Sequence, residues 1–146
     1  MAAIITVTYA AFDPGESTGF ALFAATGEVF EMGVVRTREE LYGLLERIGE
    51  VPNVIIEEYK LFKGKALQQS GSKMEAVRVI GVIESWAHQN SAKVKFQDPS
   101  IKKIAEMWSG VKPKGAHSKS HSIDAFNHGY YYLIKNKVLQ LELRPE

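Results

Sequence analysis

Cysteine is absent from the sequence, and so is any long apolar run. Without cysteine the chain can form neither a disulfide bond nor a thiolate metal site. No apolar stretch approaches the ~18 residues that a membrane-spanning helix needs. The N-terminus, MAAIITVTYAAF, lacks the basic region of a secretion signal. These absences predict a cytoplasmic protein with no membrane partner.

Charge is distributed unevenly along a chain of otherwise ordinary composition. The 146 residues are 45% hydrophobic, which suits a single domain over residues 1–146 with a substantial core. Residues 1–59 contain three basic and ten acidic side chains, whereas residues 60–119 contain twelve basic and four acidic ones. This asymmetry indicates either a solvated face or a basic surface beside an acidic site, as a binder of phosphate backbones requires.

The hydrophobic pattern predicts an α/β sandwich with a mixed sheet, because strands come first and then alternate with helices. Thr37 and Glu40 form a capping box before one of the helices. Residues 63–73, rich in Gly, Ser and Lys, predict a loop or the start of a helix. Strands are predicted over 3–12, 18–26, 28–36, 54–59 and 93–97, helices over 37–50, 74–89, 99–110 and 121–137, and a loop over 111–120.

The helix predicted over 74–89 is apolar on more than one side. Ala76, Ile80, Ile83 and Ala87 form one stripe, and Val77 lies nearly opposite it. A helix on the surface of a monomer needs one apolar stripe only. The pattern therefore fits a central core helix and a dimer contact equally well.

Acidic residues occur at places that the predicted fold brings together. Asp13 ends the first strand, and Glu57 and Glu58 end the fourth; adjacent strand residues point to opposite faces, so only one of the two shares a face with Asp13. His121 and Asp124 are expected in the first turn of the last helix, where the i, i+3 spacing makes them neighbours. Taken singly, each has an ordinary explanation: Asp13 as a turn former, Glu57 as a surface acid at a strand end, and the other two as residues that decorate a helix start.

Together these four residues predict a metal site. Carboxylate oxygens with one imidazole suit Mg²⁺ or Mn²⁺. Two such ions, roughly 3.5–4 Å apart, clamp the attacking and leaving oxygens of a phosphodiester. The hypothesis at this point is a two-metal centre for phosphodiester hydrolysis.

The motifs resemble those of the RuvC-like Holliday junction resolvases, which belong to the ribonuclease H-like superfamily. The stretch FDPGESTGFALF is similar to the first-strand motif of that family, and HSIDAFNHGYYYL is similar to its closing helix. VIIEEY resembles the strand of the second acid, and QDPSIKKIAEM resembles the strand-Pro-x-x-Val-Lys segment. The resemblance runs from about residue 5 to residue 134.

The resemblance implies a ribonuclease H-like fold, with a mixed five-stranded sheet flanked by helices. It also implies a homodimer that nicks a four-way DNA junction symmetrically and leaves 5′-phosphate ends, with metal-activated water as the nucleophile. Asp13, Glu57, His121 and Asp124 would be the catalytic and metal-binding residues, with Glu58 as the alternative to Glu57 and two Mg²⁺ ions per site, for which Mn²⁺ can substitute. His121 stands where family members carry Asp or His. Compact members of this kind are common among bacteriophages.

Basic and aromatic residues after Glu57 and before the last helix predict contacts to branched DNA. Aromatic rings stack on unpaired bases, and lysines hold phosphates. Phe62 is the candidate for the wedge that family members insert at the crossover, although Tyr59 and Phe62 fit a core position equally well. The candidate DNA-binding residues are Tyr59, Lys60, Phe62, Lys63, Lys65, Lys73, Lys112, Lys114 and Lys119.

Three other functions share parts of this pattern. ATP-handling proteins of the actin and sugar-kinase type use a similar Asp-x-Gly-x-Thr-Gly turn, but they need a second domain and a second phosphate loop. A DNA-binding domain without catalysis is disfavoured by the complete set of acids. A nuclease of the same fold that acts on RNA–DNA hybrids, flaps or other branched DNA stays an alternative.

Overall fold

The computed structural model describes residues 6–59, 71–112 and 117–141, and within these ranges the side chains of residues 71–73 and 117–120 are not described. Five strands form one sheet in the order β3-β2-β1-β4-β5. The elements are β1 (Tyr9–Asp13), β2 (Thr18–Phe23), β3 (Val29–Val35), α1 (Arg38–Ile48), β4 (Asn53–Glu57), α2 (Gly71–Gln89), β5 (Lys93–Gln97), the 3₁₀ helix η2 (Pro99–Ile101), α3 (Lys102–Ser109) and α4 (His117–Lys135).

The sheet is mixed, as the sequence predicts. β1, β2 and β3 pair antiparallel through short turns, which is the arrangement that hairpin connections allow. β1 and β4 pair parallel, and so do β4 and β5; α1 connects β3 to β4, and α2 crosses over from β4 to β5. The prediction of a mixed five-stranded sheet flanked by helices is confirmed.

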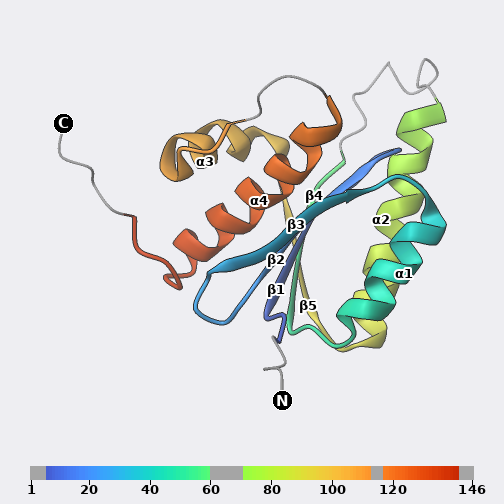
Figure 1. Cartoon of the computed structure of the whole chain (residues 1–146), viewed down its shortest axis with the longest axis horizontal. Coiled ribbons are helices and arrows are strands. Elements are labelled where there is room, and N and C mark those ends of the chain that lie inside the picture. Colours follow the sequence, from blue (N-terminus) through green and yellow to red (C-terminus); the bar gives the residue numbers. More distant parts are fainter. Residues whose placement is uncertain (1–5, 60–70, 113–116, 142–146) are drawn as a thin grey trace.

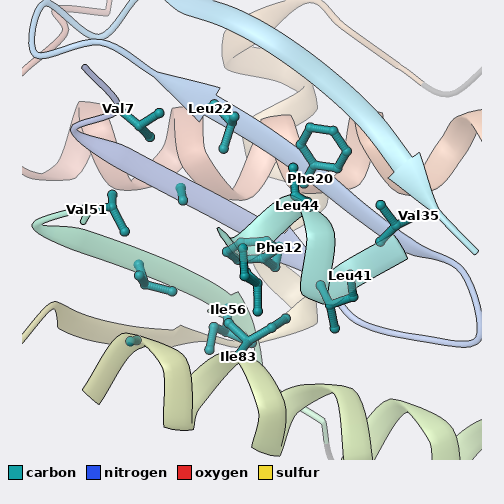
Figure 2. Packing of buried hydrophobic residues seen from close by; sticks show 14 of the residues in the cluster. Val7, Phe12, Phe20, Leu22, Val35, Leu41, Leu44, Val51, Ile56 and Ile83 are labelled. Carbon is teal, nitrogen blue, oxygen red and sulfur yellow. The ribbon is translucent and has the colours of Figure 1, made fainter. Parts of the chain in front are cut away.

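Helices cover both faces of the sheet (Figure 1): α1 and α2 lie on one side, and α3 and α4 on the other. Alternate residues of β1 point to opposite faces, so Phe12 packs toward α1 and α2 whereas Ala11 packs toward α4. Figure 2 shows the larger core, where Phe12 and Ile56 of the sheet lie near Ile83 of α2.

The helix α2 packs one side of its surface into that core. Val79 and Ile83 are buried, whereas Met74 and Val77 are 53% and 46% exposed. The wide apolar pattern of this helix therefore includes a face that the described part of this chain does not cover.

Two predicted boundaries of the last helix and its loop were wrong. α4 begins at His117, four residues before the predicted start, so His117 and Lys119 belong to the helix and not to the preceding loop. His121 and Asp124 consequently lie in the second turn of α4, and not in its first turn as predicted. No helix among residues 6–59, 71–112 and 117–141 is long and apolar enough to cross a membrane.

Candidate active site

Asp13 and Glu57 end two adjacent parallel strands. Phe12 pairs with Ile56, so the next residue of each strand reaches the same edge of the sheet on the face that α4 covers. Asp13 is 6% exposed and Glu57 is 9% exposed. Glu58 follows the end of β4 and is exposed. It lines an open cleft that Asp13 and Glu57 also line. Burial of two carboxyl groups side by side is costly unless something positive compensates for it.

Helix α4 brings His121 and Asp124 to this edge. Gly19 of β2 pairs with Asp13, and a Cβ atom at Gly19 would overlap the backbone carbonyl of His121. The absence of a side chain at Gly19 therefore lets the helix approach the strands. His121 Nδ1 lies 2.9 Å from Asp13 Oδ2, a hydrogen bond that joins α4 to β1.

Lys102 is a site residue that the sequence analysis missed. It begins α3, and its Nζ lies 3.0 Å from Glu57 Oε1 and 3.5 Å from Asp124 Oδ2. Burial alone would lower the pKa of Lys102, but the attraction of Glu57 and Asp124 raises it above its ordinary value. The signal was present in the motif QDPSIKKIAEM, where a lysine follows the proline at the start of a helix. Because one ammonium contacts both acids, Glu57 and Asp124 belong to one cluster.

The buried carboxyl pair holds a proton more tightly than isolated acids would. Burial raises the pKa of Asp13 from 3.8 to about 7, with a hydrogen bond from His121 acting against it and one to Glu57 acting with it. Burial would also raise the pKa of Glu57, but His128 and the Asp13 carboxyl lower it below its ordinary value. The raised pKa of Asp13 and the lowered pKa of Glu57 therefore favour one bound proton for the pair, as is typical of interacting carboxyl groups.

The other two members of the cluster respond to the same charges. The hydrogen bond to Asp13 raises the pKa of His121 above its ordinary value, although partial burial opposes this. Burial raises the pKa of Asp124, against the opposing effect of Lys102. Among the described residues, the ammonium of Lys102 and the imidazole of His121 thus contact the three carboxyl groups of the site.

The cluster lies at one end of an open cleft of about 790 Å³. Its walls come from the Asp-Pro-Gly turn after β1, from α2, and from the segment that joins β5 to α3. Tyr59, a predicted DNA contact, also lines this cleft. The acid cluster is therefore part of the lining of an open cleft.

The chemistry of the donor set fits a hard divalent cation. Two of the three carboxyl groups, those of Glu57 and Asp124, already attract the ammonium of Lys102, and oxygen donors are what Mg²⁺ prefers. In the part of the chain that the structure describes, no three His, Asp or Glu side chains are arranged closely enough to hold a metal ion as they stand. Lys102 would have to leave Glu57 and Asp124 before both could ligate a cation.

Most of the predicted DNA contacts fall outside the described part of the structure. Lys60, Phe62, Lys63, Lys65 and Lys114 lie outside the described residues. For Lys73 and Lys119 the structure places the backbone in α2 and α4. Lys112 is exposed after α3.

In structure the chain is similar to RuvC of T. thermophilus. RuvC in complex with a Holliday junction substrate matches with a TM-score of 0.61 and 18% identity, over 88% of this chain and 95% of that one. A further structure of Thermus thermophilus RuvC matches with a TM-score of 0.45 and 17% identity, over 87% of this chain and 96% of that one. No family sequence model matches the chain. No curated protein matches it in sequence either. The match at a TM-score of 0.61 confirms the predicted fold, a ribonuclease H-like mixed five-stranded sheet flanked by helices.

Proposed function

We propose that this chain is a metal-dependent endonuclease that resolves four-way DNA junctions. The observation that carries the proposal is the convergence of Asp13, Glu57, Asp124, His121 and Lys102, from β1, β4, α4 and α3, at the end of one cleft. A fold alone does not define a function, so the argument rests on this site. The junction complex of T. thermophilus RuvC, which shares the fold, supports branched DNA as the substrate class.

Asp13, Glu57 and Asp124 are the proposed holders of two Mg²⁺ ions, with Mn²⁺ as a substitute, and His121 is the proposed fourth member of the set. When bound, such ions polarise a phosphodiester and lower the pKa of a coordinated water. Asp13 links β1 to the rest of the set, because it accepts the hydrogen bond of His121 and interacts with Glu57. The shared proton of the Asp13–Glu57 pair must leave before both groups act as full anions, so binding would release a proton.

Lys102 has two proposed roles. In the metal-free protein its ammonium compensates Glu57 and Asp124, at 3.0 and 3.5 Å. Once those carboxylates ligate cations, the same ammonium becomes available to a phosphate group in the cleft. A lysine that is 28% exposed at the edge of the cleft can change partners in this way without unfolding α3.

Symmetric nicking of a junction requires two active sites, so the proposed enzyme is a homodimer. The uncovered apolar residues of α2, Met74 and Val77, lie on a helix whose other face packs in the core, and they fit a contact between two copies. The basic segment 60–119 supplies the proposed phosphate contacts, and Tyr59 and Phe62 supply the proposed stacking surfaces. Cleavage by water attack is expected to leave 5′-phosphate ends.

One experiment tests the proposal against its main alternative. The protein is incubated with a synthetic four-way junction and, separately, with an RNA–DNA hybrid, each with and without Mg²⁺. We expect paired nicks in the junction only with Mg²⁺, and products that a ligase can reseal because they carry 5′-phosphates. Faster cleavage of the hybrid would favour the alternative nuclease.

Variants separate catalysis from binding. Asp124→Asn should abolish cleavage and still bind the junction, since the proposed phosphate contacts are made by lysines and not by Asp124. Glu16→Gln is a matched control, because Glu16 lines the same cleft but is exposed and lies outside the cluster. Cleavage by Asp124→Asn at the rate of the unmodified protein would contradict the proposed site.

A further inference from the structure

A buried histidine with an unused ring nitrogen lies behind the acid cluster. His128 of α4 is 0% exposed, and its Nε2 has no hydrogen-bond partner among the described residues. Glu57 Oε1 lies 3.8 Å from this nitrogen. Buried polar atoms are nearly always paired, so an unpaired nitrogen that faces a functional carboxylate calls for a reason.

Gln97 fixes which nitrogen of His128 carries the proton. Gln97 Nε2 lies 2.9 Å from the carbonyl oxygen of His128 and 3.1 Å from His128 Nδ1. The contact with the carbonyl shows that this atom of Gln97 is the amide nitrogen, because an oxygen there would face another oxygen. Its second N–H then donates to Nδ1, which must be unprotonated. With one proton on the imidazole, that proton is therefore on Nε2, the nitrogen that lies 3.8 Å from Glu57 Oε1.

The sheet places the three residues together. Gln97 of β5 pairs with Glu57 of β4, so both side chains point to the face of the sheet that α4 covers. His128 comes from that helix, one turn after Asp124. Gln97 is itself buried at 5% exposure, which keeps its amide from exchanging partners with water.

From this geometry we infer that His128 is a positioning residue, which Gln97 holds in the Nε2–H form so that it orients the carboxylate of Glu57 from the side opposite the cleft. The inference rests on the proposed function, because Glu57 needs a fixed orientation only if it ligates a cation. Lys102 Nζ lies 3.0 Å from Glu57 Oε1. His128 Nε2 lies 3.8 Å from the same oxygen, which is longer than a hydrogen bond by less than about 1 Å. When Lys102 leaves, His128 remains as the donor that faces this oxygen.

Such a donor affects metal affinity more than it affects folding. Hydrogen-bond partners of ligating carboxylates fix the direction of their oxygen lone pairs, and their loss typically weakens metal binding by about 10–100-fold. The two contacts of His128 can also be separated by mutation. Asn places an oxygen near the position of Nδ1, and Gln places an amide N–H near the position of Nε2.

The test compares His128→Asn with His128→Gln, using Mg²⁺ alone as the probe and calorimetry of the full-length protein without DNA. We expect His128→Asn to bind Mg²⁺ about 10–100-fold more weakly, and His128→Gln to keep most of the affinity. Thermal unfolding without metal should be similar for the two variants, because both bury an amide. Unchanged affinity in His128→Asn would overturn the inference, and so would an equal loss in both variants, which would trace the effect to packing.

A second measurement separates this inference from the proposed function. In ¹⁵N-labelled metal-free protein, the imidazole resonances should show His128 protonated at Nε2 and bare at Nδ1, and the Nε2 resonance should move in Glu57→Gln. A proton on Nδ1 would refute the role of His128, and so would an Nε2 resonance that stays at the same position in Glu57→Gln. If the unmodified protein binds no Mg²⁺ but shows these resonances, the proposed metal enzyme fails while the His128–Glu57 contact stands.

Discussion

The replacement Asp13→Asn should stabilise the metal-free protein at alkaline pH while it abolishes the proposed activity. Asp13 is 6% exposed and shares a proton with Glu57, so ionisation of the second carboxyl group is unfavourable in the folded state. Asn keeps the size of the side chain and an oxygen that can accept from His121, but it carries no charge. The carboxyl group of Asp13, which the proposed activity needs, is thus expected to lower the stability of the metal-free protein.

The magnitude follows from the pKa. Burial is the largest of the effects that raise the pKa of Asp13 from 3.8 to about 7. A carboxyl group with a raised pKa contributes stability that is present at low pH and is lost as pH rises through the folded-state value. His121 acts in the same sense, because its hydrogen bond to Asp13 raises its pKa. Between pH 5 and pH 8, Asp13 alone sets an upper limit of about 3 kcal/mol, and relaxation around the site should reduce this to about 1–2 kcal/mol.

Urea unfolding without metal at pH 5 and pH 8 measures this difference directly. We expect the stability gained in Asp13→Asn to be larger at pH 8 than at pH 5, and we expect Mg²⁺ to reverse the order at pH 8, since it should stabilise only the unmodified protein. Glu16→Gln is the matched control, because replacement of an exposed acid changes stability by less than about 0.5 kcal/mol. A gain independent of pH, or a loss at pH 8, would refute the shared-proton account.

Other expectations follow from single contacts. Lys102→Met removes the cation from between Glu57 and Asp124, and should destabilise the metal-free protein by about 1–3 kcal/mol in urea titrations. Added Mg²⁺ should restore the lost stability. Destabilisation that Mg²⁺ does not relieve would argue against a position shared by the ammonium and a metal ion. Gly19→Ala should lower the melting temperature and junction cleavage together, because a Cβ there overlaps the backbone of α4. Gly43→Ala, on the open side of α1, should instead raise stability by about 0.5–1 kcal/mol. Equal effects of the two replacements would contradict the close approach of α4 to β2. Junction affinity, measured by fluorescence anisotropy, should fall steeply with salt because lysine–phosphate contacts release counterions, and a flat response would argue against the basic surface.

The sequence predicts the sheet well because each strand carries its own signal. The run KVKFQ becomes β5 with the predicted bounds, and Thr37 caps α1 through the amide of Glu40 as its side chain indicates. Asp13 and Glu57 can be anticipated as neighbours, because both end apolar runs that must lie in the same sheet. Local pattern and position at strand ends are enough for these features.

Features that depend on packing between distant segments could not be read from the sequence. Lys102 looks like one lysine among many in a basic segment, and only the approach of α3 to β4 makes it a member of the acid cluster. The early start of α4 was missed because residues 117–120 carry polar side chains without a helical apolar stripe. His128 is fully buried next to Gln97, but its spacing along α4 indicates only that it lies one turn after Asp124.

Crystals soaked in Mn²⁺ would show most directly whether the acids hold divalent cations together. The account predicts two anomalous peaks, roughly 3.5–4 Å apart, with Asp13 contacting both, Glu57 and Asp124 each contacting one, and Lys102 moved away from them. Soaked crystals without a peak in contact with Asp13, and with Lys102 still bound between Glu57 and Asp124, would contradict it.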